Sequence, residues 1–180
     1  MKDMDEELID DLRIASRQPD LDPRVICARL LEECPEFGHL KEGEVDICWI
    51  ESVEGMTDKG RHVLGMVHEP KVQGKLSSMF SWMLRLVHGA DPDFIIRIDA
   101  MFWAGATPME REILVYHELS HIAHAEDKDG EPKYNDDTGR PVYCIVGHDI
   151  EEFSNVARRY GAWSADLQNF AQALKEGTTA

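Results

Sequence analysis

The residues of this 180-residue chain best suited to chemistry are two histidines four positions apart, His117 and His121, with Glu118 directly after the first. In a helix, residues at this spacing lie one turn apart and within about 40° of each other around the axis, so both imidazoles can bind one metal ion. Glu118 then lies on the flank of the pair, where its carboxylate can take a proton from water without binding the ion itself. The pattern His-Glu-x-x-His therefore predicts a metal-dependent hydrolytic site.

The residues before this motif predict the helix that must carry it. Thr107 can cap a helix, Pro108 suits its first position, and Glu110 completes a capping box at the third. We expect this helix to run to about Ala125. An apolar stripe lies opposite the histidines: Val115, Leu119 and Ile122. The helix can thus bury one face in a core and present the other to a cleft.

A catalytic zinc ion usually has three protein ligands and one water, so the two histidines need a third partner. His148 is the first candidate, because it follows Gly147 on a turn after a predicted strand and can project into a cleft. Glu152 is the alternative ligand. Asp149 either caps the next helix or accepts a hydrogen bond from a ligand imidazole. We expect His148 rather than Glu152, because a capping-box bond to the Asp149 backbone would compete for the Glu152 carboxylate.

Hydrophobic periodicity and turn signals predict one α+β domain over residues 1–180, with a small mixed or antiparallel sheet and flanking helices. The expected helices cover residues 3–17, 23–34, 76–87, 108–125, 150–160 and 163–174. The expected strands cover residues 45–50, 61–68, 94–99 and 142–146. Asp22 and Pro23 mark the start of the second helix, and residues 126–139 are expected to form a loop or irregular hairpin.

The charge of the chain restricts its partners. With 19 basic and 35 acidic residues the net charge is −16, which disfavours nucleic-acid binding through a basic surface. No segment is long and apolar enough to cross a membrane, and the acidic start does not resemble a secretory signal. Four cysteines without paired spacing are expected to be reduced thiols, which predicts a cytoplasmic protein. The oligomeric state and the substrate are not predictable from the sequence.

Residues 93–170 resemble the family of putative phage metallopeptidases, small cytoplasmic zincin-like proteins of bacteriophages and prophages. Four motifs carry the resemblance: Asp93-Phe94-Ile95-Ile96, His117-Glu118-Leu119-Ser120-His121-Ile122, Gly147-His148-Asp149-Ile150-Glu151-Glu152-Phe153 and Arg158-Arg159-Tyr160-Gly161. The resemblance implies a zinc-dependent peptidase acting on peptides or proteins in the host cytoplasm. His117 and His121 would be zinc ligands, Glu118 the catalytic base, and the His148 motif would close the site. The chain is more loosely similar to SprT-type metalloproteases.

The zincin-like resemblance also implies how a peptide substrate would bind. The strand before the metal-binding helix would add a substrate strand to its edge, and residues 94–99 would take that role. Zinc and Glu118 would activate water for attack on a peptide carbonyl, and Tyr143 or Tyr160 could donate a hydrogen bond to the oxyanion. A different hypothesis follows from the net charge: an acidic, non-catalytic binding protein, stabilised by zinc, that mimics DNA or inhibits a host protein.

Overall fold

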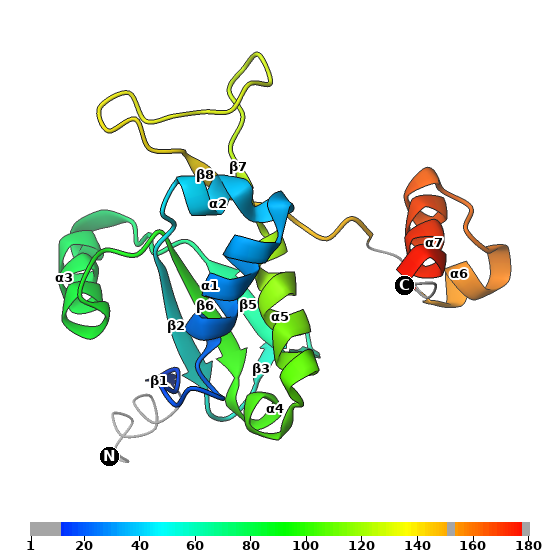
Figure 1. Ribbon diagram of the computed structural model, residues 1–180, viewed down its shortest axis with the longest axis horizontal. Coiled ribbons are helices and arrows are strands. Elements are labelled where there is room, and N and C mark those ends of the chain that lie inside the picture. The colour runs from blue at the N-terminus through cyan, green and yellow to red at the C-terminus, as the bar shows by residue number, and fades with distance from the viewer. Residues whose placement is uncertain (1–11, 151–153, 178–180) are drawn as a thin grey trace. The chain divides into compact units, whose positions relative to one another are not determined.

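The computed structural model describes residues 12–150 and 154–177 and has a mixed α+β architecture, as the sequence predicts (Figure 1). The chain divides into two compact units, with the boundary between Val146 and Gly147. The first unit contains the β-strands and helices α1–α5, and the second contains helices α6 and α7. That residues 1–180 form one zincin-like domain stays a prediction.

The helices are α1 (Pro23–Glu33), α2 (Gly38–Glu42), α3 (Ser77–His88), α4 (Ala100–Gly105), α5 (Pro108–Ser120), α6 (Ser154–Tyr160) and α7 (Ala165–Gly177). The strands are β1 (Leu12–Ile14), β2 (Ile47–Ser52), β3 (Met56–Asp58), β4 (Arg61–Val63), β5 (Gly65–His68), β6 (Phe94–Asp99), β7 (Ile122–His124) and β8 (Tyr143–Ile145).

A four-stranded mixed sheet with the order β1-β2-β6-β5 is the centre of the first unit. Strand β2 runs parallel to β6, while β1 and β5 pair antiparallel with β2 and β6, respectively. Strand β6 is therefore hydrogen-bonded along both sides, and β5 is an edge strand. Two smaller antiparallel pairs, β3 with β4 and β7 with β8, complete the strand set of the described residues.

The hydrophobic core lies between one face of this sheet and helices α1 and α5, which run side by side over it (Figure 1). Alternate residues of β6 point into this core: Phe94, Ile96 and Ile98 are all almost completely buried. Trp49 of β2 and Leu30 of α1 join them. The apolar side chains at every second position of β6 thus pack against the apolar faces of helices α1 and α5. This packing holds α5 on the sheet.

Several predicted elements are confirmed. Helix α1 begins at Pro23 with the Asp22 side chain accepting from the Arg24 backbone, and β6 has the predicted bounds. Residues 126–139 form an irregular hairpin, with isolated antiparallel bridges between Glu126 and Pro132 and between Tyr134 and Pro141. All four cysteines are free thiols, and burial raises the pKa of Cys27 to about 12. In the described part of the chain, no helix is long and apolar enough to cross a membrane.

The predicted helix over residues 3–17 is wrong where the structure describes it. Residues 12–14 form strand β1, paired with residues 50–52 of β2. Leu12 and Ile14 fit both helical and alternating patterns, and only pairing with a strand far along the chain decides between them. The part of this prediction that covers residues 3–11 lies outside the described residues.

Three other boundaries also differ from the predictions. The strand expected over 61–68 is broken at Leu64 into β4 and β5, which belong to different sheets. Helix α5 ends at Ser120 instead of Ala125, because residues 122–124 pair with β8. Ile150 is not helical, so Asp149 does not cap a helix that starts there, and α6 is assigned from Ser154. The sequence also gave no signal for the short helices α2 and α4.

Candidate metal centre

Helix α5 is fixed at its start by the predicted capping box. The Glu110 backbone N–H donates to Thr107 Oγ1 at 3.3 Å, and the Thr107 backbone N–H donates to Glu110 Oε2 at 2.7 Å. The predicted apolar stripe is confirmed, because Val115, Leu119 and Ile122 are buried. The helix therefore packs on the core with one face and leaves the motif's histidines on the other.

His117 and His121 come together as their spacing predicts. Their Nε2 atoms are 3.3 Å apart, although His121 is the C-cap residue of α5 rather than an interior helical position. Two nitrogens bound to one tetrahedral zinc at about 2.0–2.1 Å would lie about 3.3–3.4 Å apart. The pair thus already has the separation that one zinc ion requires.

The backbone of Val146 sets the orientation of the His121 ring. His121 Nδ1 lies 2.7 Å from the Val146 carbonyl oxygen, and the Val146 N–H donates to the His121 carbonyl at 2.8 Å. Nδ1 must carry the proton to donate to that carbonyl, so Nε2 keeps its lone pair and faces His117. Hydrogen bonds of this kind orient metal-binding histidines in many proteins.

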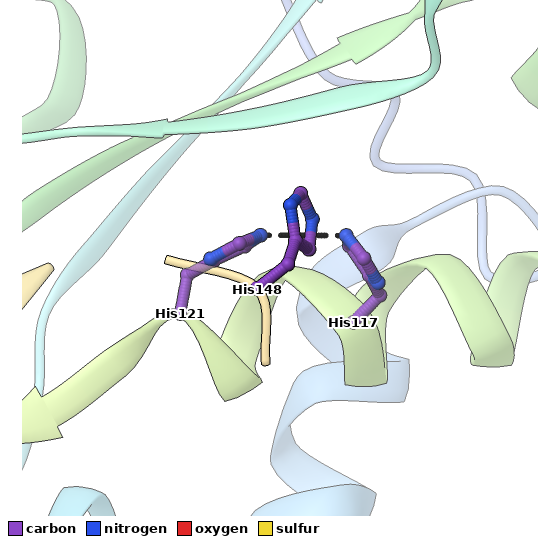
Figure 2. Close-up of side chains that lie close together, drawn as sticks. All are labelled: His117, His121 and His148. Carbon is purple, nitrogen blue, oxygen red and sulfur yellow. Dashed lines mark hydrogen bonds between the residues drawn. The ribbon is translucent and has the colours of Figure 1, made fainter. Parts of the chain in front are cut away.

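His148, two residues after Val146, joins the two helix histidines. Among the described residues, His117, His121 and His148 are the group that could hold a metal ion, with one nitrogen of each lying within 4.8 Å of the others. Figure 2 shows the three rings facing a common point, with His148 contributed by the segment after β8. Three imidazoles form a donor set that suits zinc and leaves a fourth position open.

Glu118 follows His117 on α5, and its carboxylate lies in a tight space against Gly65 of β5. Its side chain is 2% exposed, and its Oε2 atom is buried with no hydrogen-bond partner among the described residues. Burial raises the pKa of Glu118 to about 7. A buried, unpaired carboxyl with a pKa near neutrality is suited to take and return a proton.

Gly65 of the edge strand makes the space for this carboxylate. A Cβ atom at position 65 would lie 2.2 Å from Glu118 Oε1, which is far inside van der Waals contact. Gly65 was not among the residues singled out from the sequence. A glycine inside a predicted strand does signal a close approach by another group, but it does not say which group approaches.

His39 is a second residue near the motif to which no sequence pattern points. Its Nε2 lies 2.9 Å from the Ile122 carbonyl, and its Nδ1 lies 3.1 Å from the Glu36 carbonyl. The Tyr143 hydroxyl in turn donates to the His39 carbonyl at 3.2 Å. These contacts tie helix α2 to the chain just after His121 and so support the end of α5.

The other residues predicted for the site are Glu152, Asp149, Tyr143 and Tyr160. Glu152 lies outside the described residues. Asp149 belongs to the second unit, where it lines a pocket with Asp166 and Phe170 of α7. The Tyr143 hydroxyl is engaged with His39, and Tyr160 is an exposed residue of the second unit. The roles considered for Glu152, Tyr143 and Tyr160 stay predictions, as does that of Asp149 as acceptor from a ligand imidazole.

The predicted substrate strand requires a correction. Residues 94–99 form β6, whose two sides are already paired with β2 and β5, so no peptide can add to it. The free side of the sheet next to α5 belongs to β5, the strand that contacts Glu118. Strand β6 directly precedes the α4–α5 region in the sequence, but the edge of the sheet is formed by β5, which comes earlier in the chain.

No curated protein and no solved structure matches the chain significantly. The model of the family described as "Putative phage metallopeptidase" matches residues 16–175, which include the three histidines, Glu118 and most of each unit. The chain therefore belongs to the putative phage metallopeptidase family.

Proposed function

We propose that this protein is a zinc-dependent metallopeptidase that hydrolyses peptide bonds, with a zincin-like catalytic domain. The observation that carries the proposal is the combination of three converging histidines with a buried, unpaired carboxyl beside them. Membership of a metallopeptidase family supports a metal ion and a hydrolytic reaction. The nitrogen-only donor set and the 3.3 Å separation of two of its atoms favour zinc.

The proposed ligands are His117, His121 and His148, and the proposed catalytic base is Glu118. When bound, the ion would supply a Lewis acid that acidifies water and polarises the peptide carbonyl. Glu118 Oε2 would accept the proton of the attacking water and then deliver it to the leaving amine nitrogen. A pKa near 7 suits both transfers, because the carboxyl can hold and release a proton close to neutral pH.

The free edge of β5 is the proposed position for the substrate backbone. An extended peptide added to this edge would hydrogen-bond to main-chain groups of residues 65–68, which imposes little sequence preference. Because Gly65 contacts Glu118, a peptide on this strand would pass beside the base. The substrate class is therefore an extended segment of a peptide or protein. The proposed location is the cytoplasm of the host.

An acidic, zinc-stabilised binding protein without catalysis is the alternative function, motivated by the net charge of −16. It would need the metal for stability but not the basic carboxyl of Glu118. The two functions therefore make the same prediction for zinc binding and opposite predictions for Glu118.

Zinc binding by single-site variants tests the proposed centre. The chelator-treated protein should bind one zinc per chain, and His117→Ala and His121→Ala should abolish tight binding. His148→Ala should weaken the zinc affinity at least tenfold, while Glu152→Gln should leave it unchanged. Titration calorimetry measures all four variants. Loss of zinc from Glu152→Gln but not from His148→Ala would replace the three-histidine centre by one with two histidines and a glutamate.

A further inference from the structure

Helix α3 presents a large apolar face to solvent. Six apolar side chains on or next to this helix are about half exposed or more: Leu76, Met79, Trp82, Met83, Leu86 and Val87. We call these six residues the α3 stripe. The helix also has a body side, where Phe80, Leu84 and His88 are half-buried. The α3 stripe is thus a second apolar face, in addition to the one that holds α3 in place.

The spacing of the α3 stripe is that of a helix-packing seam. Leu76, Met79, Met83 and Leu86 follow one another at intervals of three, four and three residues, and Trp82 and Val87 widen the seam to about 140° of the helix circumference. Side chains at these exposures offer roughly 600–700 Å², which approaches the about 800 Å² per partner of a standard protein interface. Such a patch exceeds the scattered apolar exposure usual on a monomer.

Charges at the two ends of α3 favour an antiparallel partner with the same surface. Lys75 precedes the helix, is exposed, and makes no ion pair among the described residues. The C-terminal end carries Asp91, paired with Arg85, and Asp46, paired with His88; both carboxylates are more than 40% exposed. Two antiparallel copies of α3 would bring Lys75 of each close to Asp91 of the other, whereas Asp46 lies with His88 on the body side. The helix dipoles would also be oppositely aligned.

We propose that this protein forms a homodimer in which the α3 helices of two copies pack antiparallel around a two-fold axis, stripe against stripe. Isologous contacts of this type are the commonest way to close an assembly. The net charge of −16 does not prevent it, because residues 70–90 contain no acidic side chain and salt screens the more distant charges. The acidic groups at the end of α3 disfavour an anionic lipid surface as the occupant.

Sedimentation velocity of the full chain between about 1 and 200 µM tests the proposal. The wild type should change from monomer to dimer in this range. Met83→Glu should raise the dimer dissociation constant at least tenfold, because it places a charge in the centre of the seam. Met101→Glu is the matched control: Met101 on α4 is 77% exposed, so the same change there should leave the dissociation constant unaltered. Circular dichroism verifies that both variants fold.

Lys75→Glu tests the antiparallel arrangement separately. It should raise the dimer dissociation constant roughly three- to tenfold, since two exposed ion pairs are lost per dimer. Lys128→Glu on the 126–139 hairpin changes the net charge equally and should have no such effect. A wild type that stays monomeric up to 200 µM would overturn the proposal, as would equal effects of Met83→Glu and Met101→Glu. Equal effects of the two lysine variants would overturn the antiparallel arrangement.

Discussion

The carboxylate of Glu118 has little freedom, because it lies between helix α5 and the backbone of Gly65. In Gly65→Ala the new Cβ would have to displace the carboxylate, which can move at its flexible end but then loses its position. We expect peptide hydrolysis to fall at least tenfold, with zinc content and folding retained. Gly105→Ala adds a methyl group in open space and is the control. Unchanged turnover in Gly65→Ala would show that Glu118 does not need this position.

Titration of the Glu118 carboxyl should make the stability of the metal-free protein depend on pH. Its pKa is raised to about 7 in the folded chain, from an ordinary value near 4.5. The neutral carboxyl is thus favoured by folding, so its stabilising contribution is complete below about pH 4.5 and is lost as the pH rises to about 7. The loss amounts to roughly 3 kcal/mol.

Comparison with Glu118→Gln isolates this effect, because the amide does not titrate. In the presence of chelator, the unfolding free energy of Glu118→Gln relative to wild type should increase between pH 4.5 and 7 and then become constant. Urea unfolding at several pH values measures the difference. A difference that does not vary with pH would mean that Glu118 is ionised throughout this range.

At the scale of the elements, the capping box of α5 is expected to matter for stability rather than for the reaction. Thr107→Ala removes the side chain that accepts from the Glu110 backbone and should lower the unfolding free energy by about 1 kcal/mol. Thr57→Ala, at an exposed position of β3, should lower it by much less. Urea unfolding compares the two variants. A loss in Thr107→Ala no larger than that in Thr57→Ala would mean that α5 is held by core packing alone.

The sequence predicts those elements whose signals are local. Asp22 with Pro23 and Thr107 with Glu110 mark helix starts by contacts within a few residues, and β6 has an unbroken apolar, β-branched run. Strand β1 and the end of α5 are not predicted, because both depend on pairing with strands far along the chain. The stripe of residues 12–15 fits a helix equally well until β2 is in place.

In the candidate site, too, the local features are predictable from the sequence, and the contacts between distant segments are not. The spacing of His117, Glu118 and His121 is sufficient to predict their common face, since one helix holds all three. The contacts of Glu118 with Gly65 and of His121 with Val146 join residues 53 and 25 positions apart, and no local pattern encodes them. Tertiary packing therefore supplies what the motif does not contain, namely the burial of the proposed base Glu118 and the tautomer of the proposed ligand His121.

For the whole molecule, zinc should stabilise the folded chain, because the three proposed ligands converge only after folding. At a free zinc concentration about 100 times the dissociation constant, the gain is about 2.7 kcal/mol, which corresponds to an increase in Tm of roughly 5–10 °C. Differential scanning calorimetry measures it, with Mg²⁺ as the control ion. The double variant His117→Ala/His121→Ala should show no increase. An equal increase in that variant would place the zinc elsewhere.

Peptide hydrolysis by wild type and Glu118→Gln, each stripped of metal and resupplied with one equivalent of zinc, tests the central claim most directly. With fluorescently labelled casein as substrate, the account predicts that zinc restores hydrolysis by the wild type. Glu118→Gln should bind the same amount of zinc and hydrolyse at least 100 times more slowly, because the amide cannot accept the proton of the attacking water. Equal rates for the two zinc-loaded proteins would contradict the account, and a zinc-loaded wild type without activity would favour the acidic binding protein.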